Sequence, residues 1–485
     1  MTLSTSIRHG AAWLFVGKSS NQIIGFVCGI ILARLLVPED FGTLITVQVF
    51  TGLAGFIAGG GMGQALVRAK EVSAHDYDIV FTLQFTVGCV IYACFFAAAP
   101  WFAKWYDRPL FADLLRVSAL SFMFRPFVNL PSSILHRNMH FKALTGVRVS
   151  ALLLTNGVSI CMALLGYGVW SLVCGGIAGA ISGMFLLIPL AKWRPKFSSD
   201  IRRGRDIARY GMLVSVTDVL WYLRNQTSVF ILSRTLGPAS VGLYNKGESL
   251  AQMPHQFITA SVYDVLFRAM AKEQDNLDKC RYLFFRSIGL VALYATPFYI
   301  GLLWLAEPLV RGFYGPKWLE AASPLFILAF AWPFWLMDNL SGAVLAAKNW
   351  LGREVLVQAS GLIVTCLTVL IGVSYGVKGV AYAIVGTYMY SALYMYWLAA
   401  ASLNARWLDF VRALIPAATL NAILACVLCV VSYTLPADIR SNDLLYLMAM
   451  GVAGGVVYGL CFLYLPISAL KTEQQRWKAK LRLPT

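Results

Sequence analysis

Apolar stretches of about 20 residues recur from one end of this 485-residue chain to the other. As a helix, each stretch is long enough to cross a hydrocarbon layer of about 30 Å. Charged residues make up only 13% of the chain, about half the share in soluble domains. So little charge cannot cover the surface of a water-soluble protein of this length. The sequence therefore predicts an all-α, multi-pass membrane protein and excludes a soluble enzyme, a disulfide-stabilised secreted protein and a disordered chain.

Charges, prolines and glycines divide the apolar sequence into about fourteen stretches of spanning length. They lie near residues 11–33, 43–66, 80–100, 111–133, 146–165, 169–191, 211–233, 242–264, 287–306, 322–345, 356–375, 379–401, 413–435 and 444–466. We expect one transmembrane helix in each.

The distribution of Lys and Arg predicts the orientation of these spans. With the amino terminus placed in the cytoplasm, the cytoplasmic segments hold more than three times as many basic residues as the opposite segments. Basic residues resist translocation and lie well against anionic lipid. Both termini are therefore expected in the cytoplasm. The same bias explains the net charge of +17 without nucleic acid as a partner.

Two internal repeats indicate a duplicated architecture. Residues 31–42 and 231–242 are identical at six of twelve positions, at an offset of 200, and residues 167–169 recur as residues 375–377, at an offset of 208. Such repeats predict two six-helix lobes followed by two C-terminal helices. Because six is an even number, both lobes have the same orientation, which implies a pseudo-two-fold axis along the membrane normal.

A basic connector between the repeats is the predicted lobe boundary. The expected organisation is a first lobe at 1–191, a cytoplasmic connector at 192–209, a second lobe at 210–403, the last two spans within 404–470 and a cytoplasmic tail at 471–485. Trp477 among basic residues in the tail is typical of an amphipathic helix on an anionic membrane surface.

Ionisable side chains inside the first lobe are candidate site residues, because a buried charge in a membrane survives mainly where it lines a cavity or finds a partner. Lys18 and Gln22 recur at helical spacing with Gly25 and Gly29 and form a narrow polar face on the first span. The alternative is that Lys18 extends to the cytoplasmic surface. Arg125 is also a candidate, because the proline that follows it bends the helix and leaves a backbone carbonyl unpaired.

A second group of candidates lies on the seventh span. Asp218 occupies the position that Lys18 has in the first repeat, and Arg224 lies about 9 Å further along the helix. Arg224 is near the predicted bilayer centre, where extension to the surface helps least. An ion pair with Asp338 or Asp264 is the alternative role for Arg224. The candidates on one broad face of this helix are Asp218, Trp221, Arg224 and Asn225.

Four motifs occur in order along the chain at residues 61–68 (GMGQALVR), 135–142 (LHRNMHFK), 168–173 (GVWSLV) and 236–244. With about fourteen spans, they resemble the polysaccharide-transporter branch of the multidrug/oligosaccharidyl-lipid/polysaccharide flippase superfamily, the Wzx-type exporters. The resemblance covers about residues 7–400. It implies a flippase that moves undecaprenyl-diphosphate-linked oligosaccharides across the bacterial inner membrane for exopolysaccharide, capsule or O-antigen synthesis.

The candidate residues suit that substrate chemically. Fixed cations stabilise an anionic diphosphate inside a low-dielectric layer, while Trp221, Tyr222, Asn225 and Gln226 can stack on sugar rings or bond to their hydroxyls. The expected partners are the lipid-linked oligosaccharide, membrane lipids and glycan polymerase or assembly proteins. We expect no enzymatic activity, no metal site and no cofactor, and the coupling ion stays open.

Two other functions compete with this interpretation. A cation-coupled drug exporter of the same superfamily should carry acidic groups in its first lobe, but the spans predicted there hold Lys18, Arg116 and Arg125 and no Asp or Glu well inside. A membrane-embedded glycosyltransferase is suggested by residues 76–78, which have the Asp-x-Asp spacing of a metal chelator. Their connector is too short to hold a catalytic domain.

Overall fold

The computed structural model describes residues 3–59, 61–68, 72–198, 200, 219–273 and 275–483. The described residues form helices and contain no strand, as predicted. They divide into two compact units, Met1–Gly242 and Leu243–Thr485. The predicted connector at 192–209 lies mostly outside the described residues.

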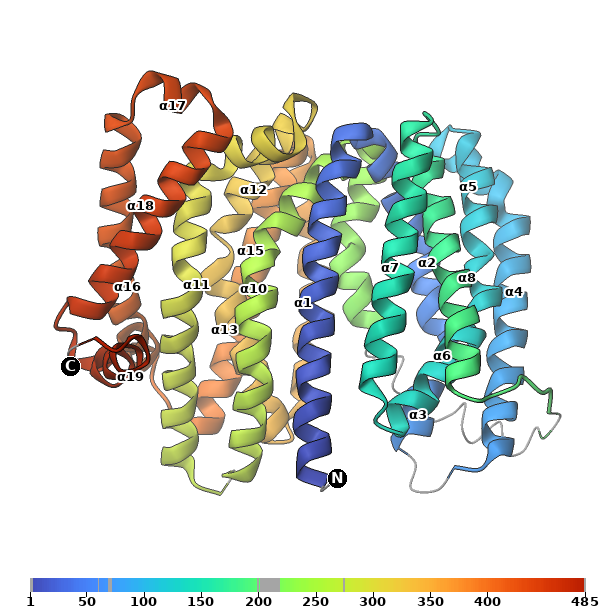
Figure 1. The fold of residues 1–485 in the computed structure, drawn as a ribbon, viewed down its shortest axis with the longest axis horizontal. Helices are drawn as coiled ribbons and strands as arrows, with labels where there is room; N and C mark the ends of the chain where they lie inside the picture. Colours follow the sequence, from blue (N-terminus) through green and yellow to red (C-terminus); the bar gives the residue numbers. More distant parts are fainter. Residues whose placement is uncertain are drawn as a thin grey trace. The chain divides into compact units, whose positions relative to one another are not determined.

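The first unit is built from long helices joined by short turns (Figure 1). They are α1 (Leu3–Leu35), α2 (Pro38–Gly59), α3 (Met62–Arg68), α4 (Ala74–Tyr106), α5 (Leu110–Ala119), α6 (Ser121–Arg137), α7 (Phe141–Leu164) and α8 (Val169–Leu190), with a further helix at 219–235. α10 (Pro238–Lys272) starts in this unit and continues into the second.

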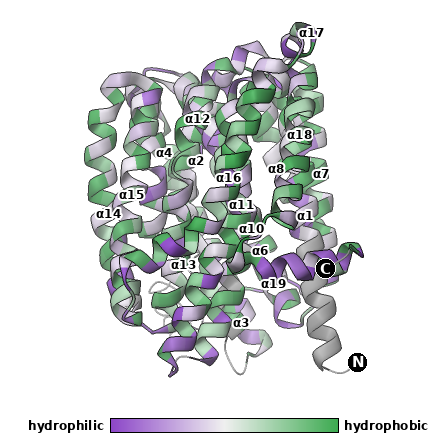
Figure 2. Cartoon of the chain, turned by 90° about the vertical axis from the view of Figure 1, so that its left-hand side faces the viewer, coloured by the Kyte–Doolittle hydropathy of each residue, from purple (hydrophilic) through white to green (hydrophobic). Residues whose placement is uncertain are grey.

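The second unit continues the all-helical architecture. Its helices after α10 are α11 (Leu277–Tyr314), η1 (Pro316–Ala321), α12 (Ala322–Ala329), α13 (Trp332–Ala347), α14 (Leu351–Gly372), η2 (Val373–Tyr375), α15 (Gly376–Leu403), α16 (Trp407–Thr434), α17 (Ala437–Ser441), α18 (Asp443–Tyr464), η3 (Ser468–Leu470) and α19 (Lys471–Leu481). In Figure 2 most of these helices are largely hydrophobic, whereas α19, which lies in the predicted tail, is hydrophilic.

Where the structure describes the predicted spans, their residues are mostly helical, but several spans are not single straight helices. Residues 60 and 211–218, in the spans predicted at 43–66 and 211–233, lie outside the described residues. The predicted span at 322–345 comprises α12 and α13, which meet at an angle of 54°. Pro333 at the start of α13 favours this break, because proline cannot continue a preceding helix. Among the described residues, eight helices are long and apolar enough to cross a membrane, or nine with the bent pair. The chain is a multi-pass membrane protein, and the number fourteen stays a prediction.

Both sequence repeats correspond to matching turns. Before α2, the N–H of Leu36 donates to the Leu32 carbonyl at 2.8 Å, and before α10 the N–H of Leu236 donates to the Leu232 carbonyl at 2.9 Å. The shorter repeat begins α8 and α15, where Gly168 has φ 52° and Gly376 has φ 72°. Glycine adopts this left-handed conformation without a steric penalty. The repeats are therefore structural as well as sequential.

The amino-terminal ends of α2 and α10 cross in direct backbone contact inside the first unit. A Cβ atom added to Gly42 would overlap the carbonyl oxygen of Pro238, and one added to Gly242 would overlap the carbonyl oxygen of Pro38. These pairs are related by the offset of 200 residues. The contact is thus reciprocal, with a local two-fold relation between residues 38–42 and 238–242.

Side-chain contacts in the second unit join the ends of neighbouring helices. Arg281 near the start of α11 donates to the Leu403 carbonyl at 2.9 and 3.1 Å, close to the end of α15. Near the other end of α11, Arg311 forms an ion pair with Asp443, at the start of α18. This alternation of helix ends agrees with the predicted up-and-down order of the last spans (Figure 1).

Candidate substrate cavity

A cavity of about 820 Å³ lies inside the first unit, among helices with largely apolar exteriors. Its walls come from α2, α3, α4, α6, α7 and α8. Glycines of α2, α3 and α8 and of the α2–α3 break form much of the lining and leave room that larger side chains would fill. The volume lies in the range of about 300–1,000 Å³ that is typical of small-molecule sites.

Helix α6 supplies most of the polar wall. Its cavity-lining polar residues are Asn129, Ser132, Ser133 and His136. They follow Arg125 at spacings of four, seven, eight and eleven residues, so all five share one helical face. The lining residues present amide, hydroxyl and imidazole groups, which can bond to sugar hydroxyls or phosphate oxygens.

The Arg125 guanidinium occupies a notch in α2 next to the cavity. A Cβ atom on Gly55, which lines the cavity, would overlap the Nη1 atom of Arg125. The guanidinium carbon also lies 5.1 Å from the centre of the Phe122 ring, a cation–π geometry. The structure thus places the predicted candidate Arg125 at the edge of a polar cavity.

Gln84 of α4 contributes a buried acceptor to the same cavity. Its Nε2 atom donates to the Gly59 carbonyl at 3.2 Å, while its Oε1 atom is buried and has no hydrogen-bond partner among the described residues. A buried polar atom without a partner costs free energy, so this oxygen favours a hydrogen-bond donor in the cavity. Arg148 of α7 adds a positive charge to the lining.

The sequence did not single out several of these cavity residues. Gln84, Ser132, His136 and Arg148 were missed because each is unremarkable by itself. The helical spacing that starts at Arg125 could have revealed the α6 residues. Gln84 and Arg148 become site residues only through the packing of separate helices, which no local pattern predicts.

The predicted polar face of α1 lies beside open space. Lys18 is exposed and Gln22 is half-buried. Nothing lies within 4 Å of a Cβ atom built on Gly25 or Gly29, so these glycines do not serve close helix packing. α1 instead contacts α7 through Gly17, whose added Cβ would lie 2.7 Å from the Thr145 side chain. Neither Lys18 nor Gln22 lines the 820 Å³ cavity.

The candidates on the helix at 219–235 do not share one environment. Arg224 is buried, with 8% of its surface exposed, whereas Trp221 is 55% exposed and Asn225 is half-buried. These candidates therefore differ in burial. Asp218 lies outside the described residues. In the second unit, Asp338 accepts a hydrogen bond from the Ser391 hydroxyl at 2.7 Å.

Tyr222 has a packing role that the sequence did not indicate. Its hydroxyl lies 2.9 Å from the Gln48 carbonyl and 3.0 Å from the Val49 carbonyl of α2, and can donate to either. A Cβ atom on Gly52 would overlap the Tyr222 hydroxyl, and the ring lies 5.2 Å from that of Phe56. Tyr222 thus packs the helix at 219–235 against α2.

The Asp-x-Asp sequence at residues 76–78 begins a helix. The N–H of Ser73 donates to the Asp76 carboxylate at 2.8 Å, and the Ser73 hydroxyl accepts from the Asp76 N–H at 3.3 Å. This reciprocal pair is a capping box, which satisfies donors at the start of α4. Asp76 is buried. The local geometry therefore explains this carboxylate without a bound metal.

The fold of the chain is similar to the folds of solved membrane transporters. The structure of the lipid II flippase MurJ, in an inward closed conformation, superposes with a TM-score of 0.76 and 16% identity, covering 92% of this chain and 96% of MurJ. An inward-facing multidrug resistance MATE family transporter of the MOP superfamily gives a TM-score of 0.63 and 17% identity, covering 79% of this chain and 94% of that one. At these identities the likeness concerns the fold.

Comparison of the amino-acid sequence identifies the family of the chain. Residues 31–323, more than half of the chain, match the family described as "Polysaccharide biosynthesis protein", and the chain belongs to that family. It is 24% identical to the succinoglycan biosynthesis transport protein ExoT of Rhizobium meliloti, over 70% of this chain and 67% of ExoT. It is 23% identical to the lipopolysaccharide biosynthesis protein WzxC of Escherichia coli, over 72% of this chain and 71% of WzxC. The teichuronic acid biosynthesis protein TuaB of Bacillus subtilis is 22% identical, over 72% of each chain.

Proposed function

We propose that this protein is a flippase that moves lipid-linked oligosaccharides from the cytoplasmic to the outer leaflet of a bacterial inner membrane. The observation that carries the proposal is the polar cavity in the first unit, with Arg125 at its edge and Arg148 in its wall. Family membership and the flippase-like fold support it. The product enters exopolysaccharide, capsule or O-antigen synthesis, and a glycan polymerase or assembly protein is the expected downstream partner.

The cavity chemistry fits a diphosphate with attached sugars. Arg125 and Arg148 stabilise the phosphate charge, which must cross a layer of low dielectric constant. Asn129, Ser132 and His136 offer donors and acceptors to sugar hydroxyls. The prenyl chain remains in the lipid, so the cavity has to hold only the head group. Lys18 and Arg224 are proposed to contribute further positive charge to the path that the head group takes across the membrane.

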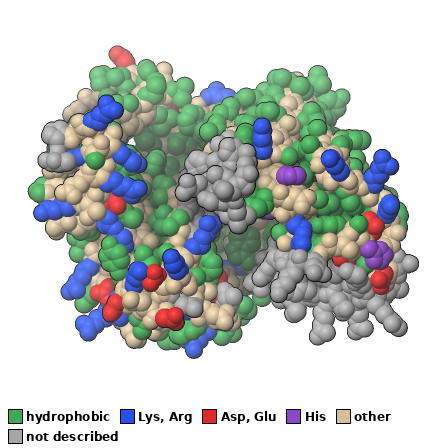
Figure 3. Space-filling view, turned by 60° about the horizontal axis from the view of Figure 1, so that its bottom comes forward, with side chains coloured by type: hydrophobic (Ala, Val, Ile, Leu, Met, Phe, Trp, Pro, Cys, Tyr) green, Lys and Arg blue, Asp and Glu red, His purple; other side chains and the backbone are tan. Residues whose placement is uncertain are grey.

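The proposed orientation places both termini and the connector at 192–209 in the cytoplasm, and lobes at 1–191 and 210–403. The bias of Lys and Arg supports this arrangement. On the face that Figure 3 draws, many Lys and Arg side chains and fewer Asp and Glu side chains are visible among the described residues.

We therefore expect alkaline phosphatase fused at residue 200 or after residue 470 to be inactive, because the enzyme folds only outside the cytoplasm. A fusion after Arg440, on the predicted outer side, is expected to be active. Phosphatase activity in cells measures each location. An active fusion at either cytoplasmic position would refute the proposed orientation.

Substitution of the other candidate cations tests their place on the path. Arg224→Ala and Lys18→Ala are each expected to lower glycan export about tenfold, the effect of losing one charge-assisted hydrogen bond. Arg224→Lys should retain part of the activity, since the charge stays while the planar fork is lost. Export is measured in a strain that lacks the native gene, with membrane accumulation of each variant as the control. Unchanged export by Arg224→Ala would remove Arg224 from the proposed path.

Proteoliposomes distinguish the flippase from its two rivals. Lipid-linked oligosaccharide supplied in one leaflet should become accessible in the other, without formation of a new glycosidic bond. A cationic dye should be transported poorly, because Arg125 and Arg148 repel it. Sugar transfer from a nucleotide donor would support the glycosyltransferase, and ion-driven dye efflux would support the drug exporter suggested by the MATE-like fold.

A further inference from the structure

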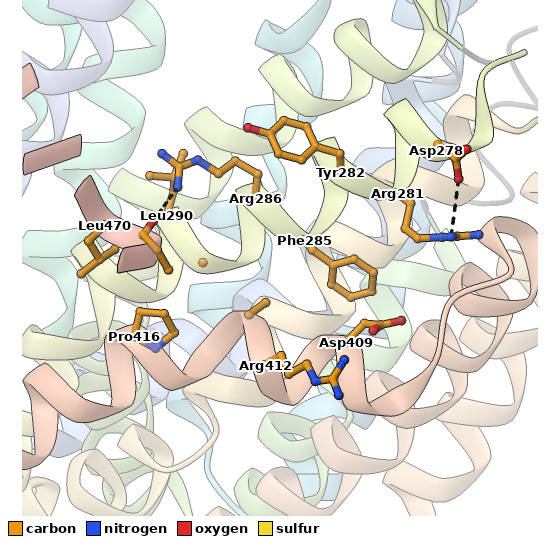
Figure 4. Close-up of a pocket in the computed structure, with 13 residues that line it drawn as sticks. Asp278, Arg281, Tyr282, Phe285, Arg286, Leu290, Asp409, Arg412, Pro416 and Leu470 are labelled. Carbon is orange, nitrogen blue, oxygen red and sulfur yellow. Dashed lines mark hydrogen bonds and ion pairs between the residues drawn. The ribbon is translucent and has the colours of Figure 1, made fainter. Parts of the chain in front are cut away.

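A second pocket, of about 570 Å³, lies in the second unit, outside the proposed substrate cavity. It is bounded by the first turns of α11, the first turns of α16 and residues 469–470, which lead into α19 (Figure 4). Phe285 and Leu290 extend from α11 toward α16, where Pro416 lies. The pocket thus has an apolar floor between two helices that are long and apolar enough to cross a membrane.

Three arginines surround this floor, and two of them form hydrogen bonds with other groups of the protein. Arg281 donates to the Leu403 carbonyl at 2.9 and 3.1 Å. Arg286 donates to the carboxylate of Glu473 at 3.0 Å. Arg412, an exposed residue of α16, makes no hydrogen bond or ion pair with any residue that the structure describes. The pocket therefore contains one guanidinium whose five donors are available to a ligand.

The acidic groups around the pocket have roles that leave Arg412 available. The Asp409 carboxylate accepts from the Arg406 N–H at 3.0 Å and caps the start of α16. Asp278 is 92% exposed and lies 3.5 Å from Arg281, and Glu473 is paired with Arg286. None of these carboxylates lies within 4.0 Å of Arg412, which stands next to Asp409 in the close-up (Figure 4).

Pro416 provides a backbone acceptor at the same place. Proline has no N–H, so it cannot donate to the carbonyl four residues earlier, which is that of Arg412. Pro416 itself lines the pocket. The site therefore combines a guanidinium donor, a carbonyl without its usual helical donor and an apolar floor. A phosphodiester next to hydroxyl groups, attached to an acyl chain, has the complementary set of groups.

The residues around the pocket point to a lipid as the ligand. Exposed aromatic residues flank it, with Tyr282 65% exposed on α11 and Trp407 46% exposed at the start of α16, a composition typical of a membrane–water interface. The hydrophilic helix α19 adjoins the same region, where Trp477 donates to the Tyr294 hydroxyl at 2.8 Å. Lipid phosphates are the abundant anions at an interface.

We propose that this pocket, the Arg412 pocket, binds the headgroup of an anionic membrane phospholipid as a resident ligand. Arg412 contacts the phosphodiester, and the Phe285–Pro416 floor receives the first part of an acyl chain. The lipid fills the space between α11, α16 and the start of α19, and it thereby stabilises the second unit. This site is separate from the proposed flippase cavity and does not depend on that function.

Titration of the purified full-length protein with dioleoylphosphatidylglycerol tests the proposal. The unfolding temperature in detergent should rise and saturate, whereas dioleoylphosphatidylcholine and inorganic phosphate should have little effect. Arg412→Gln should raise the half-saturating lipid concentration about tenfold, because one charge-assisted contact is lost. Arg268→Gln is a matched control, since Arg268 is an exposed arginine of α10 that does not line the pocket.

A second variant and a second lipid complete the test. Ala413→Leu fills the apolar floor without changing any charge and should weaken phosphatidylglycerol binding as well. Wild-type behaviour of Arg412→Gln, or an equal response to phosphatidylcholine or to inorganic phosphate, would overturn the proposal. Tighter, Arg412-dependent binding of undecaprenyl phosphate than of phosphatidylglycerol would overturn it too, because the pocket would then serve the substrate.

Discussion

Replacing Arg125 by alanine is expected to lower flipping of lipid-linked oligosaccharide on the order of 100-fold, the loss that follows when a diphosphate forfeits two charge-assisted hydrogen bonds. The guanidinium lies against Gly55, at the edge of the polar cavity. Arg125→Lys should retain a measurable rate, because the charge remains although the two-pronged geometry is lost. Initial rates in proteoliposomes, normalised to reconstituted protein, measure the effect.

The matched control for Arg125 is Arg116→Ala. Arg116 belongs to α5, its guanidinium carbon lies 4.6 Å from the centre of the Phe96 ring, and it does not line the cavity. Its substitution should leave the flipping rate within about twofold of wild type, because this half-buried side chain lies outside the cavity lining. Equal losses for Arg116→Ala and Arg125→Ala would show a general effect of removing positive charge and would contradict a specific role for Arg125.

Substitution of Gly42 or Gly242 by valine is expected to prevent accumulation of folded protein. Even a single Cβ atom at either position overlaps a backbone carbonyl oxygen, and backbone cannot move aside as a flexible side chain can. Overpacking of a close contact typically costs about 1–3 kcal/mol and can cost more, and here both helix ends must separate. Yield of monodisperse protein and its unfolding temperature measure the loss.

Gly25→Ala is the control for this prediction, because nothing lies within 4 Å of the Cβ atom it adds to α1. Alanine is favoured over glycine inside a helix by about 0.5–1 kcal/mol, so this variant should be at least as stable as wild type. The double variant Gly42→Val/Gly242→Val should be less destabilised than the sum of the single variants, since both break one contact. A normal yield of Gly42→Val would show that the contact between residues 38–42 and 238–242 is not rigid, and would contradict the prediction.

Local sequence patterns predicted the features of this protein that depend on local chemistry. Spanning length follows from the apolar runs, and the offset of 200 residues revealed the repeat, whereas the contact between Gly42 and Gly242 came only from the structure. Arg125 was found because a charge inside an apolar run is conspicuous. The rest of the cavity was not found, because Gln84 and Arg148 are ordinary residues until separate helices bring them together.

Two features of the helix at 219–235 lie beyond what a local sequence pattern predicts. Tyr222 was expected to face sugars, but its hydroxyl lies against α2 carbonyls, a contact with residues more than 170 positions away along the chain. The side chains predicted on the face of Arg224 also differ in burial, since Arg224 is buried and Trp221 is exposed. Helical spacing indicates which side chains share a face of a helix, but it does not indicate which other residues that face contacts.

The reciprocal crossing of residues 38–42 and 238–242 also bears on the ancestry of the chain. Two segments that touch through equivalent atoms make an isologous contact, the kind found between the subunits of a two-fold homodimer. A protein made of one repeat could form the same contact by pairing with a second copy of itself. Fusion of two such copies would preserve the contact, and since each glycine leaves space for the other segment's carbonyl, neither position could then diverge alone.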